Sequence, residues 1–378
     1  MIAGRPKHRF VILDSLRGVC AIMVALFHFR ANSHVDALPL VRDSWLFVDF
    51  FFVLSGFVIA ANYQEKLTSG SVSSGRFMAL RLARVYPLHV FMLVLFLLVE
   101  VMMAVLPIGH GMLGHDPFSG TRSLELIPEN LLLMQSLAGP GIASWNVPSW
   151  SISAEVWTYL VFAGSMMFGR IGHAIFWALT LVLAPLMILI WHGSSMALEA
   201  DGGMLRCLVG FGTGVMLWAI WKRDLVPARV MGWIEVPVMA LVVIFVIFAP
   251  GLGLTMLGPI VFGLAVWTFT AERGVLSSLL AHRVFVTLGT LSYSIYMTQT
   301  FVHARMKNLA TVVQAHMHTP LYANQVQQLF GTTKWMGDGF VVACCVVTVM
   351  VSTLTYRYVE LPGQGLVRRR PIVQPEAL

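Results

Sequence analysis

Charged side chains are scarce in this chain, at 11% of its 378 residues, whereas soluble domains average about 25%. No polar stretch is long enough to form a separate soluble domain. Hydrophobic residues instead make up 57% of the sequence and recur in apolar runs of about twenty residues, enough to cross a bilayer. The scarcity of charge excludes a soluble globular protein and predicts an all-α polytopic membrane protein. We expect one membrane domain over residues 1–378, with short tails at 1–10 and 363–378.

Cysteine is also scarce, and its positions exclude further kinds of site. No disulfide framework is expected because the cysteines fall in apolar segments, and no Cys/His spacing resembles a metal site. The formal charge of +7 does not indicate nucleic-acid binding, since most Lys and Arg residues fall in loops on one side of the membrane. A cleavage signal is missing too, so the first apolar segment is predicted to be a retained helix. The cysteines are Cys20, Cys207, Cys344 and Cys345.

Ten apolar segments are predicted to span the membrane as helices. A further apolar stretch, 124–137, is short and carries Glu125, Pro128 and Glu129, so we expect an interfacial or re-entrant helix there. With ten spans, Lys and Arg gather on the side of the N-terminus, and both termini are therefore predicted to be cytoplasmic. The spans cover approximately residues 11–30, 45–63, 85–106, 148–169, 172–192, 203–221, 233–250, 252–270, 284–304 and 338–358.

Besides Asp14, the first span carries two further ionisable groups, Arg17 and His28. They are eleven positions apart, about three helical turns, so they lie on one stripe roughly 16 Å apart along the helix axis. Ionisable groups at membrane depth are costly and are usually kept for a pathway or a reaction. The predicted topology places Arg17 in the inner half of the membrane and His28 near the outer surface.

Two acidic residues are predicted to lie at the level of His28. Asp49 falls near the outer end of the second span, and Glu155 falls in the outer part of the fourth, after Ser151 and Ser153. A histidine held by one carboxylate, with a second acid nearby, suits a general base. The alternative is that His28 is an ordinary interfacial residue. Glu155 is more suggestive, because a buried carboxylate needs a partner.

Arg81 and Arg84 lead into the third span from the cytoplasmic side. They lie about one helical turn apart, and two guanidinium groups on one helix face suit a phosphate. The alternative is an ordinary topology signal that binds lipid headgroups.

Two later helices also carry polar groups. Tyr293, Tyr296 and Gln299 lie on the ninth span and are expected to line a polar cavity, although tyrosines near an interface are equally often anchors. Arg357 and Glu360 are three residues apart near the inner end of the last span, which predicts a structural ion pair.

Six stretches, in order, resemble signatures of the acyltransferase-3 family of integral-membrane acyltransferases. LDSLRG, with Arg17 and His28, is similar to the family's Arg-x10-His signature, and VDFFFVLSGFVIA resembles its second-span signature. RLARVYP matches its Arg-x-x-Arg-x-x-Pro element, and PSWSISAEVWTYL matches its Ser-x-x-x-Glu region. LGTLSYSIY and YRYVELP resemble its last two conserved stretches. The family often has a histidine after SYSxYxx, where this chain has Gln299, which is not a proton carrier.

The resemblance implies a stand-alone O-acyltransferase, without a fused hydrolase-like domain, in the bacterial cytoplasmic (inner) membrane. Relatives acylate surface polysaccharides, nodulation factors and some antibiotics. We therefore expect acyl-CoA, by default acetyl-CoA, as a co-substrate with no permanently bound cofactor. The expected acceptor is a hydroxyl of an extracytoplasmic saccharide or lipid-linked saccharide.

The predicted depths then suggest a role for each polar group. The donor's phosphates would bind at the inner face, and the thioester would reach the outer level, where a base deprotonates the acceptor hydroxyl. A covalent acyl-histidine or acyl-serine intermediate is the variant. The roles are donor binding by Arg17, Arg81 and Arg84, catalysis by His28 with Glu155 or Asp49, oxyanion contacts by Ser151 and Ser153, and substrate contacts by Tyr293, Tyr296 and Gln299.

Two other function classes are open from the sequence alone. A transporter or flippase would also explain intramembrane charges, but no inverted repeat and no Gly/Pro-broken helix pair is evident. A non-catalytic membrane subunit of a polysaccharide assembly machine is the second class. Turnover of acyl-CoA by the purified protein would separate catalysis from both.

Overall fold

The structure is a computed structural model that describes residues 10–105, 115–137, 143–224, 227–324 and 329–368. Within these ranges the apolar segments form helices, which satisfy backbone hydrogen bonds inside one segment. The main helices are α1 (Val11–His28), α3 (Phe47–Thr68), α4 (Ser74–Val105), α6 (Ser149–Ser165), α7 (Gly169–His192), α8 (Gly203–Trp221), α9 (Ala228–Leu252), α10 (Gly258–Phe269), α12 (Arg283–Met317) and α13 (Lys334–Thr355).

Short elements connect the main helices. The strands β1 (Tyr322–Asn324) and β2 (Leu329–Phe330) pair antiparallel between α12 and α13. The short α-helices are α2 (Pro39–Arg42), α5 (Ile127–Leu131), α11 (Val275–Leu280) and α14 (Leu361–Arg368), and a π-helical turn occupies Tyr356–Glu360. The 3-10 turns are η1 (Ser44–Leu46), η2 (Gly120–Arg122), η3 (Leu124–Leu126), η4 (Met166–Phe168) and η5 (Thr255–Leu257).

The predicted fold class is confirmed, since the chain is an all-α polytopic membrane protein. Seven segments of the described chain are long and apolar enough to cross a membrane, and one of them, Ser149–His192, contains both α6 and α7. Thr255–Phe269 is a shorter apolar helix. Each of the ten predicted spans falls on a helix. The stretch 124–137 forms only short helical turns, as expected of a segment that does not span.

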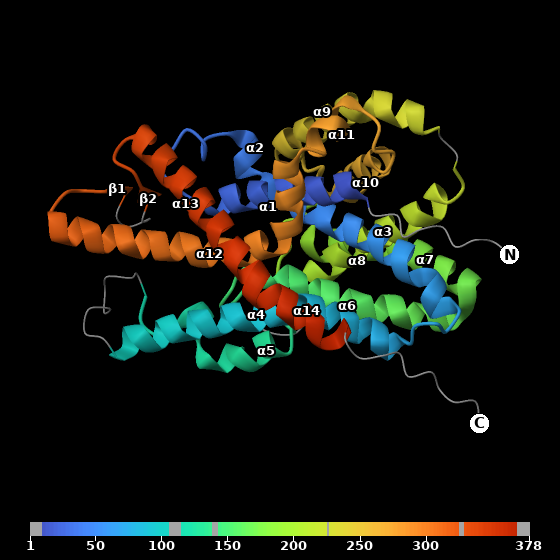
Figure 1. Cartoon of the computed structure of the whole chain (residues 1–378), viewed down its shortest axis with the longest axis horizontal. Coiled ribbons are helices and arrows are strands. Elements are labelled where there is room, and N and C mark those ends of the chain that lie inside the picture. The colour runs from blue at the N-terminus through green and yellow to red at the C-terminus, as the bar shows by residue number, and fades with distance from the viewer. Residues whose placement is uncertain (1–9, 106–114, 138–142, 225–226, 325–328, 369–378) are drawn as a thin grey trace.

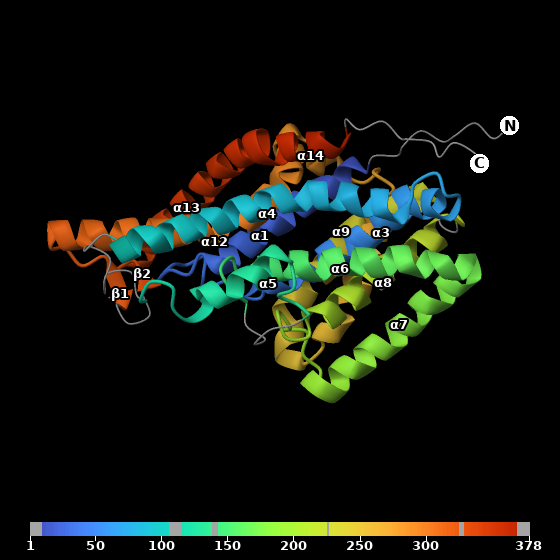
Figure 2. The same cartoon turned by 90° about the horizontal axis from the view of Figure 1, so that it is seen from below.

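α12 is longer than the sequence predicted. The ninth span was expected to end near residue 304, but α12 continues to Met317 at the left-hand end of the molecule, close to β1, β2 and the start of α13 (Figures 1 and 2). Tyr322 ties the hairpin to this extension, because its hydroxyl lies 2.8 Å from Thr311 Oγ1 and 2.8 Å from the Lys307 carbonyl oxygen. The polar residues after 304 therefore continue a helix.

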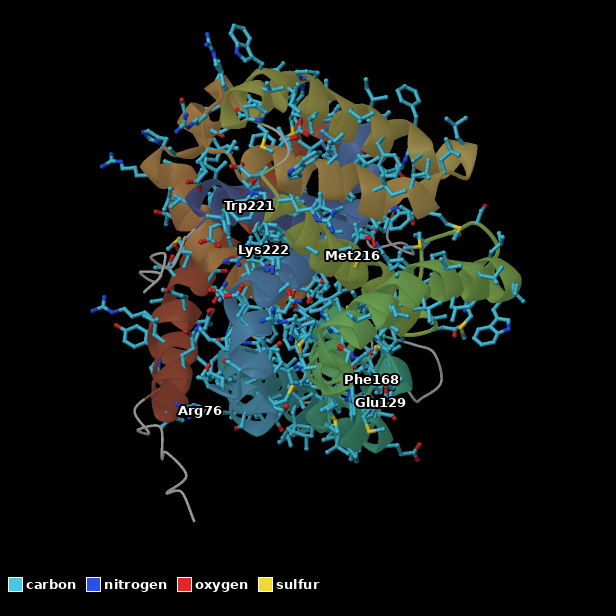
Figure 3. The ribbon with its side chains drawn as sticks, turned by 90° about the vertical axis from the view of Figure 1, so that its right-hand side faces the viewer. Arg76, Glu129, Phe168, Met216, Trp221 and Lys222 are labelled. Atoms are coloured by element: carbon cyan, nitrogen blue, oxygen red, sulfur yellow. The ribbon has the colours of Figure 1, made fainter. Side chains whose placement is uncertain are left out.

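The opposite end of the molecule carries residues that were predicted to be cytoplasmic. α3 ends and α4 begins at the right-hand side of both views, toward which the start of α1 also points (Figures 1 and 2). Figure 3 looks onto this end and shows Arg76 and Lys222. We call it the inner end, and we call the end that carries β1 and β2 the outer end.

Two glycines let α1 pack directly against α12. A Cβ atom at Gly18 would lie 2.4 Å from the Gly289 backbone nitrogen, and a Cβ atom at Gly289 would lie 2.4 Å from the Asp14 carbonyl oxygen. Larger residues would push the helices apart. This close approach brings the backbone of α12 within reach of side chains on α1.

Candidate active site

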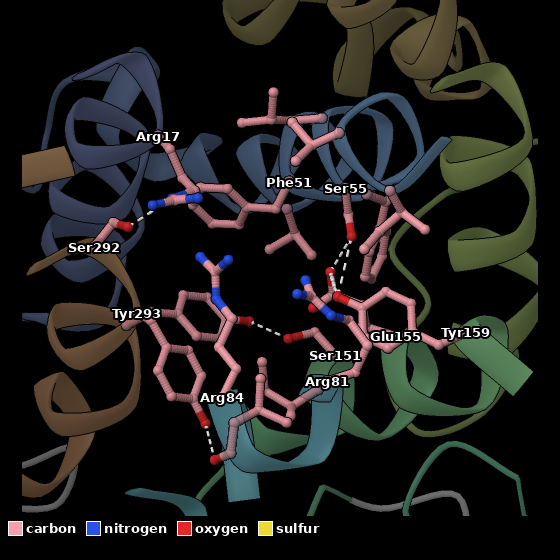
Figure 4. Close-up of a pocket in the computed structure, with 18 residues that line it drawn as sticks. Arg17, Phe51, Ser55, Arg81, Arg84, Ser151, Glu155, Tyr159, Ser292 and Tyr293 are labelled. Carbon is pink, nitrogen blue, oxygen red and sulfur yellow. Dashed lines mark hydrogen bonds between the residues drawn. The ribbon is translucent and has the colours of Figure 1, made fainter. Parts of the chain in front are cut away.

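A cavity of about 110 Å³ lies among α1, α3, α4, α6 and α12. Arg17, Arg81 and Arg84 direct their guanidinium groups into it, and Glu155 lies on the same cavity wall as Arg81 (Figure 4). Hydroxyl groups and aromatic rings complete the lining. We call this space the arginine cavity.

Arg17 is held in place by α12. Its Nε donates a hydrogen bond to Ser292 Oγ at 2.8 Å, and its Nη2 donates to the Gly289 carbonyl at 3.1 Å. The Asp14 carboxylate lies 3.3 Å from Nη2. These contacts fix the plane of the guanidinium group, so its free N–H groups point in a set direction.

Arg81 and Arg84 differ in how they are held. Arg81 Nη2 donates to the Tyr63 hydroxyl at 2.8 Å, and its guanidinium carbon lies 4.8 Å from the centre of the Tyr63 ring. Arg84 has no hydrogen-bond or ion-pair partner in the described part of the chain. A half-buried guanidinium without a partner is costly, which indicates a place for an anion. The structure thus brings together the three arginines that were predicted to bind the donor.

Glu155 accepts hydrogen bonds from two hydroxyl groups. Ser55 Oγ donates from α3, and Tyr159 OH donates at 2.5 Å from one turn further along α6. Ser55 Oγ also lies 3.2 Å from the Tyr159 hydroxyl. All three side chains line the arginine cavity. Glu155 is therefore a fixed acceptor that faces the three arginines.

A second cavity, of about 320 Å³, is lined by residues from the outer ends of α1, α3 and α6 and by the α7–α8 loop. His28 lies in its wall with Trp45, Trp150, Glu199 and Arg206. We call it the outer cavity. Arg17 and His28, both on the first span, therefore line different cavities.

The backbone of α1 sets the tautomer of His28. Nδ1 lies 2.8 Å from the Val24 carbonyl oxygen, and because a carbonyl only accepts, Nδ1 carries the proton. In the neutral ring Nε2 then has a free lone pair. This is the form that a general base requires.

The two cavities share part of their walls. Val48 and Tyr296 line both of them. The Tyr296 hydroxyl lies 2.8 Å from Ser151 Oγ, which also lines the arginine cavity. The three arginines and His28 therefore line neighbouring cavities that border the same two side chains.

Comparison with known proteins identifies the family behind this geometry. A family model described as an acyltransferase domain matches residues 10–357. The chain belongs to the acyltransferase-3 family. It is accordingly a multi-pass membrane protein of a family of acyltransferases, and the six signature stretches predicted this family.

Two curated relatives of the acyltransferase match part of it. "Protein 2 in picA locus" of Rhizobium radiobacter is 43% identical over 90 residues, which are 24% of this chain and 45% of that protein. "Acyltransferase MdmB" of Streptomyces mycarofaciens is 35% identical over 165 residues, which are 41% of this chain and 39% of that protein. The chain thus spans less than half the length of these curated relatives. No solved structure matches it significantly.

The predicted contact of Asp49 and Glu155 with His28 in this family member is wrong. Both Asp49 carboxylate oxygens accept from Arg206, from Nε at 2.8 Å and from Nη2 at 3.0 Å. Both residues of this ion pair are fully buried, and Glu155 belongs to the arginine cavity. Matched depth in the membrane had suggested that these groups meet, but depth does not specify which helix faces which.

We predict that Asp49 acts on stability. Asp49→Ala leaves the buried Arg206 charge without a partner and should lower the free energy of unfolding of the purified enzyme by about 3–5 kcal/mol. The double variant Asp49→Ala/Arg206→Met removes both charges and should recover most of this loss. Thermal unfolding in detergent measures both. A double variant that is no more stable than Asp49→Ala would contradict the structural role.

Neither serine near Glu155 has a free proton for an oxyanion. Ser151 Oγ donates to the Pro148 carbonyl at 3.0 Å, so the Tyr296 hydroxyl is the donor in their shared bond. Ser153 Oγ donates to the Leu133 carbonyl at 2.6 Å, is fully buried and lines neither cavity. The predicted oxyanion contacts of Ser151 and Ser153 are therefore wrong, and the Tyr296 proton is likewise committed, to Ser151 Oγ.

The other predicted substrate contacts differ in outcome. Tyr293 lines the arginine cavity and donates to the Val85 carbonyl at 2.6 Å. Gln299 is fully buried and lines neither cavity, and neither of its amide atoms has a partner in the part of the chain that the structure describes. Direct substrate contact by Gln299 is therefore not what this structure shows.

The predicted pair of Arg357 and Glu360 is wrong as well. Glu360 lies in a π-helical turn and is buried, where it accepts from Ser294 Oγ at 3.0 Å. The guanidinium of Arg357 lies over the ring of Tyr358, which is exposed. The i, i+3 argument assumed regular α-helix, and one wide turn changes the faces that the residues occupy.

Sequence analysis missed several residues of the two cavities. Tyr159 follows Glu155 by four residues, and this helical spacing was a signal that they meet. Trp45, Trp150 and Glu199 had no such signal, because their neighbours come from distant parts of the chain. Partial burial raises the pKa of the Glu199 carboxyl from its ordinary value, and the Arg206 charge opposes this rise.

Proposed function

We propose that this acyltransferase transfers an acyl group, acetyl by default, from cytosolic acyl-CoA to a hydroxyl of an extracytoplasmic saccharide. The donor's phosphates occupy the arginine cavity. The acceptor enters the outer cavity, where His28 is the base. The observation that supports the proposal is that Val48 and Tyr296 line both cavities, with three guanidinium groups in one cavity and His28 in the other.

The arginine cavity suits the phosphates of a CoA thioester. Three guanidinium groups offer bidentate contacts to phosphate oxygens, and Arg84 has no competing partner within the described ranges. Aromatic and aliphatic side chains complete the wall and would pack along the uncharged arm of the donor. The rise along α1 from Arg17 to His28 is roughly 16 Å, which this arm would cover in an extended form.

The transfer would proceed with His28 Nε2 as the proton acceptor. Nε2 takes the proton of the acceptor hydroxyl while its oxygen attacks the thioester carbon. The carbon–sulfur bond then breaks, and the proton returns from Nε2 to the thiolate, which leaves as CoA. The Val24 carbonyl orients the ring, in the place where many general bases use a carboxylate.

The test is acetyl transfer by the purified protein in sealed proteoliposomes. Acetyl-CoA on the side of Arg76 and Lys222 should yield acetyl esters on glycan supplied to the opposite side. Each ester formed should release one CoA thiol. Movement of glycan or of acetyl-CoA across the membrane without ester formation would contradict the proposal and favour a transporter. Absence of both would favour a non-catalytic subunit.

A further inference from the structure

Glu199 lies on a loop that the protein holds in a fixed shape. The segment 193–202 joins α7 to α8 at the outer cavity, and along it Met196, Leu198 and Ala200 are buried whereas the residues between them are exposed. Such alternation packs one face of an extended segment against the protein and leaves the other face exposed. Gly202 closes the segment with φ of +78°, a conformation that favours glycine.

Hydrogen bonds also fix the part of the loop that leads into Glu199. Arg206 Nη1 donates to the Leu198 carbonyl at 3.1 Å, and its other nitrogens hold Asp49. The Met196 backbone nitrogen donates to Thr255 Oγ1 at 2.9 Å. The buried Asp49–Arg206 pair therefore anchors the loop and restricts the backbone position of Glu199.

The carboxylate of Glu199 is unpaired in the described part of the chain, although it lines a cavity that also contains arginines. Each of those arginines has an acidic partner of its own. The partners are Asp36 for Arg30 at 3.2 Å, Asp43 for Arg42 at 3.4 Å and Asp49 for Arg206 at 2.8 Å. Among the described residues of its wall, the outer cavity thus has no arginine without an acidic partner, and the Glu199 carboxylate is an open hydrogen-bond acceptor beside the free Nε2 of His28.

Aromatic side chains form much of the remaining wall. Trp45, Trp150, Phe27 and Tyr296 all line the outer cavity with Glu199. Flat apolar faces beside a carboxylate suit a ring that is apolar on its face and carries hydroxyl groups on its edge.

We propose that Glu199 is the acceptor-binding residue and that the outer cavity binds an uncharged sugar ring. The carboxylate accepts hydrogen bonds from ring hydroxyls, and the tryptophan faces pack against the ring. This orients a further hydroxyl toward His28. The inference deepens the proposed function and rests on it, because it assigns the acceptor to the cavity of His28.

The test measures binding without any acyl donor. Saturation-transfer NMR of the enzyme in lipid nanodiscs should detect methyl β-D-glucopyranoside or methyl α-D-mannopyranoside. Glu199→Gln keeps the shape of the side chain but loses its charge, and it should raise the dissociation constant about tenfold or more, since hydrogen bonds to charged groups are the stronger ones. Asp201→Asn, which changes an exposed acid of the same loop, should leave the dissociation constant unchanged.

Several outcomes would overturn the inference. They are failure of both glycosides to bind the wild-type enzyme, equal affinity of wild type and Glu199→Gln, and tighter binding of methyl glucuronide, which is an anion. The assignment is separable from the acyl transfer itself. If the glycosides bind as expected but acetyl-CoA yields no ester, the proposed function fails and the sugar site stands.

Discussion

His28→Ala should lower the rate constant of acyl transfer by about 10²- to 10⁴-fold, the usual contribution of a general base. The Michaelis constant for acetyl-CoA should stay within about twofold of the wild-type value. His28 lines the outer cavity, whereas the proposed donor-binding arginines line the arginine cavity. The measurement is steady-state release of CoA thiol at saturating acceptor. We expect this to be the largest effect of any single substitution on turnover.

His28→Asn sharpens the result. The Asn amide can still donate to the Val24 carbonyl, as Nδ1 does at 2.8 Å, but it offers no basic nitrogen in the place of Nε2. It should therefore preserve the local fold and lose activity as completely as His28→Ala. His316→Ala, which removes an exposed histidine near the end of α12, is the matched control and should keep wild-type turnover. Wild-type turnover by His28→Asn would refute the base assignment.

Helical periodicity was enough to predict which residues of one helix share a cavity. Arg81 and Arg84 meet in the arginine cavity because one turn separates them. Arg17 and His28 lie on one stripe, and their offset along α1 carries them to different cavities, as the predicted depths required. These conclusions need only the 3.6-residue repeat and the length of the span.

Helical periodicity could not predict which side chains of different helices contact one another. Asp49 meets Arg206, and the sequence offered only the physical hint that two charges inside spans each require a partner. The sequence did not reveal how α3 is rotated about its axis, and His28 was therefore predicted wrongly as the partner of Asp49. Glu199 was missed because it lies in a loop, where no period applies. Glu360 was misplaced because a π-turn is not visible in apolar spacing.

The double variant Arg81→Ala/Arg84→Ala should raise the Michaelis constant for acetyl-CoA by about 10²- to 10⁴-fold. Two hydrogen bonds between charged groups contribute about 1.5–3 kcal/mol each, and about 1.4 kcal/mol corresponds to a factor of ten. The Michaelis constant for the acceptor should stay near that of the wild type. Lys222→Ala removes a cation from the same end of the molecule but outside the cavity, and it should leave both constants unchanged.

The effect of Arg84→Ala alone on the Michaelis constant for acetyl-CoA should be the easier one to interpret. Arg84 has no hydrogen-bond or ion-pair partner in the described chain, so Arg84→Ala breaks no such contact, whereas Arg81→Ala deprives the Tyr63 hydroxyl of its partner. Acetyl-dephospho-CoA, a donor with one phosphate fewer, identifies the contact. If the arginines bind that phosphate, the wild-type preference for acetyl-CoA over this donor should disappear in the double variant. An undiminished preference would mean that the arginines bind the remaining phosphates, and an increase in the acceptor's constant alone would remove them from donor binding altogether.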